Sequence, residues 1–143
     1  MDKEIRSAFF SRVANEAYAA KLGLKLIEVT RGHAIVEMVS SEEDTNFFGM
    51  VHGGAIFSLM DEAFQVSCNS HGTVAVALCL NVIYHNPPGV GGRLRAESKE
   101  IHRSGKTATY EIRVTDENDV LIASSQALAY RKKDNLPFLG EKP

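Results

Sequence analysis

Two features in the middle of the chain could do chemistry together: a glycine pair and an acid that follows it. Gly53 and Gly54 stand at the start of a predicted helix, where the first backbone N–H groups lack partners within the helix. With no side chain in the way, such groups point along a dipole that favours negative charge and can act as an oxyanion hole. The alternative is that both glycines only permit a tight transition from loop to helix.

Asp61 lies on the same predicted helix, at the edge of its apolar face and beside Phe57 and Gln65. The apolar positions recur at helical spacing and are Ile56, Leu59, Met60, Ala63 and Phe64. A carboxylate against apolar surface suits a general base or a nucleophile. The alternative for Asp61 is a side chain that points to water. We expect Glu62 and Ser58, which fall on the polar side of the helix, to be solvated.

The spacing of Gly53 and Asp61 limits how they could cooperate. Eight helical positions separate them, which corresponds to roughly 12 Å at 1.5 Å per residue. An oxyanion donor and an attacking group must both lie about 3 Å from one carbonyl unit, so one chain cannot supply both. If both act, two copies of the helix must run antiparallel across a two-fold axis, which predicts a homodimer with two composite sites.

The elements before this helix are predicted from their periodicity. Residues 3–21 keep helical spacing and end at Gly23, so residues 1–23 are expected to form an amphipathic cover helix. Two short β-rich runs, residues 24–30 and 34–39, flank a turn and predict a hairpin. A loop is expected to connect this hairpin to the glycine pair.

Four predicted strands follow the central helix of residues 54–70. Residues 73–84 are almost continuously apolar, which is typical of a strand covered on both faces, so we expect it at the centre of the sheet. The later strands alternate polar and apolar residues and are predicted at 93–99, 107–114 and 121–130. Only the helix is apolar enough to cover the sheet. Residues 1–143 are therefore predicted as one α+β domain, a curled antiparallel sheet wrapped around a long helix, with residues 134–143 as a frayed tail.

Composition excludes several classes of protein. The 143 residues are 44% hydrophobic and carry a formal net charge of −2, which lacks the basic excess that a nucleic-acid-binding domain needs. No apolar run approaches the roughly 20 residues that span a bilayer, and charged residues open the chain where a signal peptide is apolar. We expect no nucleic-acid partner, no membrane association and a cytoplasmic location.

Cysteine and histidine spacing gives no sign of a metal site. Cys68 and Cys79 lie in apolar segments, and we expect both to be buried structural thiols. The five histidines lack the spacing of known metal-binding motifs. We therefore predict no metal.

The run from Asn46 to Asn69 closely resembles the hotdog-fold acyl-CoA thioesterases of the phenylacetic-acid-pathway (PaaI-like) type. It contains VHGGAIFSLMDEA and then CNSHG before the long apolar strand, and the order of elements extends the resemblance over nearly the whole chain. The resemblance implies a hotdog fold and hydrolysis of acyl-CoA to a carboxylic acid and coenzyme A. It also implies a homodimer, which in this family commonly pairs into a homotetramer.

The resemblance further implies a role for each residue of the motif. Gly53 would offer its N–H to the thioester carbonyl, with Gly54 supporting the tight helix start. Asp61 would be the nucleophile or the base that activates water, Asn46 would orient that water or the thioester, and His52 would hold the loop. The chain departs from some relatives near Ala77, where they carry a serine or threonine that assists the water.

A substrate of this kind needs an acyl groove and a path for coenzyme A. We expect the acyl group near Phe57, Phe64 and Tyr84. The pantetheine arm would pass the turn of Ser104 and Gly105, and the flanking cations Arg103 and Lys106 are available for the phosphates. Coenzyme A is then part of the substrate, and we expect no separate cofactor.

Two other functions remain open at this point. A hotdog dehydratase or hydratase would use His52 and Asp61 for proton transfer at the acyl chain, although the glycines after the histidine favour carbonyl polarisation. A non-catalytic acyl-CoA-binding module would be expected to lack the carboxylate.

Overall fold

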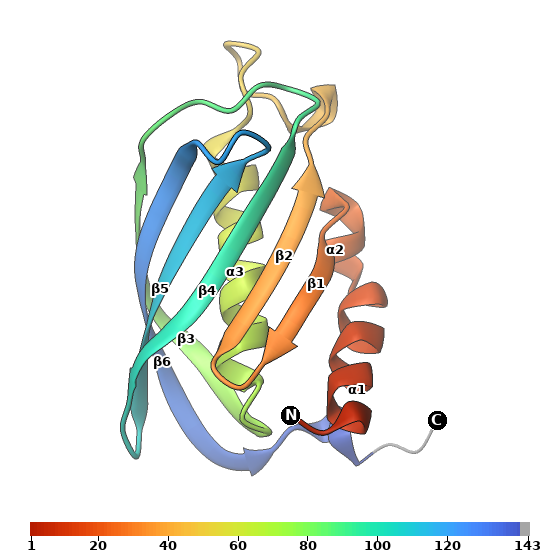
Figure 1. Cartoon of the computed structure of the whole chain (residues 1–143), viewed down its shortest axis with the longest axis vertical. Coiled ribbons are helices and arrows are strands. Elements are labelled where there is room, and N and C mark those ends of the chain that lie inside the picture. The colour runs from red at the N-terminus through yellow and green to blue at the C-terminus, as the bar shows by residue number, and fades with distance from the viewer. Residues whose placement is uncertain (141–143) are drawn as a thin grey trace.

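The computed structural model describes residues 1–140, in which an antiparallel six-stranded sheet curls around one long helix (Figure 1). The helices are α1 (Lys3–Ala14), α2 (Ala17–Leu22) and α3 (Gly53–Asn69), with 3₁₀ turns η1 (Glu42–Asp44) and η2 (Pro137–Leu139). The strands are β1 (Lys25–Thr30), β2 (His33–Val39), β3 (Thr73–Tyr84), β4 (Arg93–Arg103), β5 (Thr107–Asp116) and β6 (Leu121–Asn135). The predicted α+β architecture is confirmed.

The sheet has the strand order β1-β2-β4-β5-β6-β3, and every neighbouring pair is antiparallel. Its curvature wraps the strands around α3, which packs against all of them (Figure 1). The apolar stripe explains this position, because Leu59, Met60 and Ala63 are fully buried. α3 is thus held on most of its circumference, which fixes where its first turn and its middle lie.

The predicted cover helix is two helices with a break between them. The side-chain amide of Asn15 donates to the carbonyl of Ser11 (2.8 Å) and closes the last turn of α1. Glu16 then adopts an extended backbone before α2 begins. Gly23 ends α2 in the left-handed region at φ 66°, as the sequence predicts. The break places Glu16 at the junction of the two helices, facing α3.

The second helix covers the side of α3 that we expected to face water. Glu62 is only 4% exposed and Ser58 only 9%, so the prediction that both are solvated is wrong. The phenol of Tyr18 on α2 lies 2.9 Å from the hydroxyl of Ser58, which also donates to the carbonyl of Gly54 (2.8 Å). A helical wheel could not show this, because the covering element is distant in sequence.

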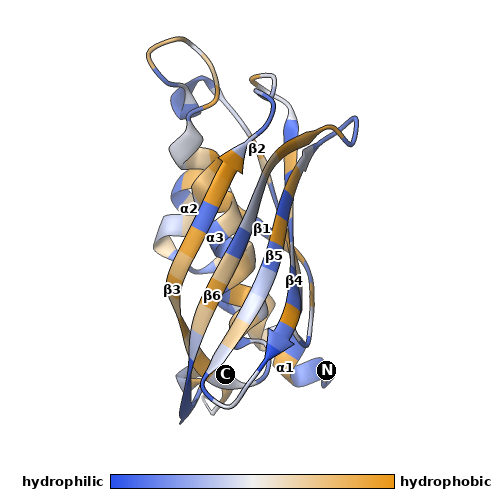
Figure 2. Ribbon diagram, turned by 90° about the vertical axis from the view of Figure 1, so that its left-hand side faces the viewer, coloured by the Kyte–Doolittle hydropathy of each residue, from blue (hydrophilic) through white to orange (hydrophobic). Residues whose placement is uncertain are grey.

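β3 is an edge strand, and the prediction of a central strand is wrong. It pairs only with β6 within the described residues, and Figure 2 shows it as the outermost strand with hydrophobic segments along it. Leu78 is 57% exposed and Ile83 is 62% exposed. Cys79 is exposed on the same strand, which contradicts the expected burial of that thiol, whereas Cys68 is buried as predicted. Val74, Leu80 and Val82 pack against the core, but the exposed apolar side chains of β3 are not covered within residues 1–140.

The chain after β6 packs against the first helix instead of fraying as far as the structure describes it. Leu136 is buried, and its N–H donates to the carbonyl of Gly72 (3.1 Å). The ring of Phe138 meets Phe9 edge-on at 5.3 Å between centroids. The last three residues of the predicted tail, 141–143, lie outside the described residues.

Candidate functional site

The start of α3 is fixed by the loop that precedes it. Thr45 and Val51 pair in an isolated antiparallel bridge, which closes the loop between them. The N–H of His52 then donates to the carbonyl of Asp44 at 2.7 Å. The chain therefore enters the helix along one defined path.

Asn46 holds the tip of this loop with both its backbone and its side chain. Its N–H donates to the carbonyl of Met50 (2.7 Å), and its Oδ1 accepts from the N–H groups of Phe48 (2.9 Å) and Met50 (3.1 Å). The side-chain oxygen is therefore committed to the loop. The Nδ2 group makes no hydrogen bond within residues 1–140, so it is the part of Asn46 that a substrate or water could accept from.

The first turn of α3 leaves one backbone donor unused. Nδ1 of His52 caps the helix by accepting from the N–H of Gly54 at 2.7 Å. The carbonyl of His52 accepts from the N–H groups of Ala55 (3.0 Å) and Ile56 (3.3 Å). The N–H of Gly53 has no partner within the described chain. It lies at the positive end of the helix dipole, where a developing negative charge is stabilised.

Two aromatic residues lie at the same end of the helix. The hydroxyl of Tyr84, at the end of β3, donates to the carbonyl of Gly53 (2.9 Å), and its side chain is half exposed. Phe57, one turn along α3, is 37% exposed. The structure thus brings six of the predicted site residues to one end of α3: Asn46, His52, Gly53, Gly54, Phe57 and Tyr84.

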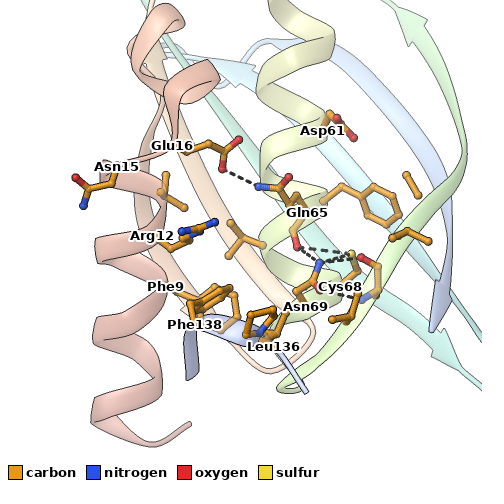
Figure 3. A pocket seen from close by; sticks show the side chains of 18 of the residues that line it. Phe9, Arg12, Asn15, Glu16, Asp61, Gln65, Cys68, Asn69, Leu136 and Phe138 are labelled. Carbon is orange, nitrogen blue, oxygen red and sulfur yellow. Dashed lines mark hydrogen bonds between the residues drawn. The ribbon is translucent and has the colours of Figure 1, made fainter. Parts of the chain in front are cut away.

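Asp61 lies two turns farther along α3, at a groove between α1, α3, β3 and the segment that contains η2 (Figure 3). The groove has a volume of about 740 Å³, and Ala77 on β3 lines it without offering a hydroxyl. Phe64 forms part of the wall and is buried against Tyr110, with ring centroids 5.4 Å apart. Burial raises the pKa of Asp61, and the nearby charge of Glu16 raises it further. A carboxylate with a raised pKa accepts a proton more readily, as a general base must.

Behind Asp61 lies a group of polar side chains that sequence reasoning missed. The Nε2 of Gln65 donates to Glu16 (2.9 Å) and to Glu62 (3.5 Å), and Figure 3 shows Glu16 reaching across to α3. Burial, followed by the charge and hydrogen bond of Glu16, raises the pKa of Glu62 to about 8. Burial and the neighbouring acid therefore favour the protonated form of Glu62. No local spacing could reveal this contact, because Glu16 and Gln65 are 49 positions apart.

The remaining predicted residues lie far from the glycine end. The turn between β4 and β5 carries Arg103, Ser104, Gly105 and Lys106, and Figure 1 places it at the opposite end of the sheet from the loop before α3. The guanidinium of Arg131 on β6 donates to the carbonyl of Ser104, which adds a third cation to this turn. Within one chain, the structure therefore forms three separate groups of predicted residues: the glycine end, Asp61 and this turn.

Comparison with known proteins identifies the family of this chain. The sequence model of the thioesterase superfamily matches residues 48–123, which include the glycine pair, Asp61 and strands β3, β4 and β5. The chain belongs to the thioesterase superfamily. This thioesterase is 32% identical over 117 residues to acyl-coenzyme A thioesterase PaaI of Escherichia coli, and the alignment covers 82% of the chain and 84% of that relative.

Solved structures agree with the sequence match. The E. coli PaaI protein from the phenylacetic acid degradation operon aligns with a TM-score of 0.87 at 28% identity, covering 92% of this chain and 96% of that one. A mutant of phenylacetic acid degradation protein PaaI from Thermus thermophilus aligns at 0.79 with 32% identity, covering 82% and 100%. The chain is therefore a PaaI-like thioesterase with the hotdog fold, an enzyme that hydrolyses thioesters.

Two further findings concern the described part of the chain. None of its helices is long and apolar enough to cross a membrane. Nowhere in residues 1–140 do three or more His, Cys, Asp or Glu side chains gather as a metal ion would require.

Proposed function

We propose that this thioesterase hydrolyses acyl-CoA to a carboxylic acid and free coenzyme A, with the N–H of Gly53 polarising the thioester carbonyl. The observation that carries this proposal is the unused N–H at the start of α3, where every neighbouring donor is engaged. A fixed donor aimed at a developing oxyanion stabilises the transition state without reorganising. The family and the E. coli PaaI relative support the acyl-CoA substrate.

Asp61 supplies the attacking side of the reaction by one of two routes. As a base, it takes a proton from water while the water oxygen attacks the thioester carbon, and it returns that proton to the sulfur when the C–S bond breaks. As a nucleophile, its oxygen attacks the carbon and expels the thiolate, and water then cleaves the resulting anhydride. Both routes place the carbonyl oxygen at the N–H of Gly53. Nδ2 of Asn46 is free to orient the water or the thioester.

The reaction needs two copies of the chain. Gly53 and Asp61 are roughly 12 Å apart along α3, so Asp61 of one copy must act with Gly53 of the other. The exposed apolar edge of β3 supports this assembly, because an unpaired edge strand is a template for another strand. A homodimer joined at β3 would cover Leu78 and Ile83. Pairing of dimers into a tetramer is an expectation that the resemblance to the family supports.

In this composite site, the remaining predicted residues would contact the acyl group and the coenzyme A part of the substrate. Phe64 on the Asp61 side, with Phe57 and Tyr84 of the other copy, would line the path of the acyl group. The turn of Ser104 and Gly105 would guide the pantetheine arm. Its cations, Arg103, Lys106 and Arg131, are those we assign to the coenzyme A phosphates. No separate cofactor takes part in either route.

The geometry weighs against the dehydratase alternative. That reaction would require His52 to exchange protons with the acyl chain, and its Nδ1 accepts the cap hydrogen bond from Gly54. Protonating this nitrogen would break the cap and loosen the start of α3. A non-catalytic binding module would have no need for the carboxylate of Asp61.

A thiol-release assay over a panel of aryl, short-chain and medium-chain acyl-CoAs tests the proposal, with enoyl-CoA formation followed in parallel. We expect stoichiometric free thiol and no enoyl product. Formation of enoyl-CoA without thiol release would show that the protein is a dehydratase instead. Tight binding of the panel without any product would identify a binding module.

A further inference from the structure

The peptide group between Gly53 and Gly54 is held at both ends by side chains. Its N–H, which belongs to Gly54, donates to Nδ1 of His52 at 2.7 Å. Its carbonyl, which belongs to Gly53, accepts from the hydroxyl of Tyr84 at 2.9 Å. One restraint comes from the residue just before the helix, and the other comes from the far end of β3, 31 residues later.

This arrangement explains why both positions are glycine. A Cβ on Gly53 would lie 3.2 Å from Cζ and 3.3 Å from the hydroxyl oxygen of Tyr84. A Cβ on Gly54 would lie 2.9 Å from Nδ1 of His52, closer than real Cβ atoms approach. A Cβ on Gly54 would displace the imidazole from the cap, and a Cβ on Gly53 would press the tyrosine ring away by a few tenths of an ångström.

The restraints on this peptide also fix its neighbour. The preceding peptide group joins His52 to Gly53 and carries the N–H assigned to the thioester oxygen. Its carbonyl accepts from Ala55 and Ile56, so the turn of the helix holds that side. The orientation of the Gly53 N–H thus depends on two consecutive peptide planes, and within residues 1–140 Tyr84 provides the one hydrogen bond to them from outside the helix and its cap.

Tyr84 is suited to donate steadily at this place. Burial raises the pKa of its phenol, so the hydroxyl keeps its proton through the neutral range. The side chain is nevertheless half exposed at the mouth of the site, so the ring remains accessible to a substrate. β3 pairs with β6 as far as Tyr84 itself, which anchors the residue to the sheet.

We propose that Tyr84 is a positioning residue that orients the N–H of Gly53 through the Gly53 carbonyl, with His52 acting on the other end of the same peptide group. This inference rests on the proposed function, in which that N–H binds the thioester oxygen. The hydroxyl contributes to the transition state, where the oxygen carries charge, more than to substrate binding.

The test is Tyr84→Phe, which removes the hydroxyl and keeps the ring. We expect kcat for the best acyl-CoA to fall on the order of tenfold and KM to change less than about twofold, because a misaligned donor weakens transition-state stabilisation. Tyr130→Phe is the matched control, since Tyr130 is also partly exposed and its hydroxyl makes no hydrogen bond within the described residues. It should retain wild-type kcat.

A double-variant cycle separates positioning from a general loss of structure. If His52 and Tyr84 hold one peptide group, His52→Ala and Tyr84→Phe together should cost clearly less than the product of their separate effects on kcat. His52→Asn keeps a capping acceptor and should restore most of the activity that His52→Ala loses. If Tyr84→Phe fails to fold, this rescue still tests the restraint on the shared peptide group.

The outcomes distinguish this proposal from the proposed function. Wild-type kcat in a folded Tyr84→Phe, or a loss confined to KM, would overturn the positioning role while leaving thioester hydrolysis intact. Fully independent effects in the double variant would also overturn it. If the wild-type enzyme releases no thiol from any acyl-CoA, the proposed function fails first and the positioning role fails with it.

Discussion

The proposed reaction uses two regions of α3, and these regions differ in the chemical group that acts. At the start of α3, the working group is a backbone N–H, and hydrogen bonds of 2.7 to 3.3 Å engage its neighbours. In the middle of α3, the working group is the carboxylate of Asp61, and the residues behind it are two more acids and an amide. Hydrogen bonds fix the orientation of the backbone donor in the first region, whereas burial and neighbouring charge set the pKa of the acid in the second.

This difference determines how the group that acts in each region responds to pH. A backbone N–H does not titrate, so the donor at the glycine end needs no change of ionisation to act. Asp61 must be ionised to act, and its pKa is raised from the usual value of 3.8. The acid limb of the activity profile should therefore report Asp61, with activity falling as the pH drops through this raised pKa.

The largest expected effect comes from the carboxylate region. Asp61→Asn should lower kcat by on the order of 10² to 10⁴ with little change in KM, because it removes the base or nucleophile at constant volume. Steady-state thiol release measures this loss. Asp134→Asn, an exposed acid at the end of β6, is the matched control. Near wild-type turnover in folded Asp61→Asn would contradict the mechanism.

Mixing two damaged enzymes tests whether both regions act on one thioester across a dimer. Asn46→Ala damages the glycine side and Asp61→Asn the acid side, so each parent dimer should be nearly inactive. In a mixed dimer, one site collects both lesions and the other collects none. With random exchange at equal concentrations, about half of the dimers are mixed, and roughly a quarter of wild-type activity should return.

Mass spectrometry of differently tagged chains verifies that subunits have exchanged. Absence of recovery in a verified mixture would mean that each chain builds its own site. The pairing of Gly53 with Asp61 would then be wrong.

A smaller effect is expected from Gly54→Ala, which acts on the backbone region alone. The new Cβ would displace the imidazole of His52 and remove the helix cap, costing about 0.5 to 2 kcal/mol of stability. We expect Tm to fall by several degrees and kcat to drop on the order of tenfold as the first turn loosens. Gly89→Ala is the control, because nothing lies within 4 Å of its Cβ. Unchanged Tm and kcat in Gly54→Ala would show that the cap is dispensable.

The smallest effect on catalysis is expected from Glu62→Gln, although it adjoins Asp61. The raised pKa of Glu62 favours its protonated form, which an amide closely matches, so kcat at pH 7 should change by less than about threefold. The effect of Glu62 should appear instead in how the stability of the wild-type protein depends on pH. Because the folded pKa of about 8 exceeds the usual 4.5, the folded wild-type chain binds more protons, and its stability falls as the pH rises between these values.

Thermal unfolding at pH 6 and pH 9 measures this response. The Tm of Glu62→Gln relative to wild type should rise between the two pH values by on the order of 5 °C. Glu43→Gln, at an exposed carboxylate, should show no such change. A constant difference for Glu62→Gln would mean that its carboxyl is ionised in the folded protein.

The two regions also differ in how far the sequence predicts them. The glycine end is formed largely by residues 46 to 54, and a contiguous motif with two glycines and a capping residue is visible in a linear sequence. The acid region depends on Glu16 reaching α3 across a helix break, which helical periodicity over residues 3–21 conceals. The same limit explains Glu62, whose polar type predicted solvent although the side chain is buried beside Glu16.

The error on β3 has a related cause. An apolar run indicates that a strand is covered on both faces but does not say which chain covers it. The sequence therefore predicted burial for residues 73–84, and a single copy places them at the edge. The order of elements and the central helix were predictable because they follow from local periodicity.

The contact between Phe138 and Phe9 has a consequence for folding on the ribosome. Both rings line the groove of Asp61, yet nearly the whole described chain separates them in sequence. Contacts of such long sequence separation form late, since the intervening chain must first be ordered. During translation, β1 can pack against α1 early, but the ring of Phe9 lacks its aromatic partner until β6 and η2 have been synthesised, so we expect α1 to dock fully only at that stage.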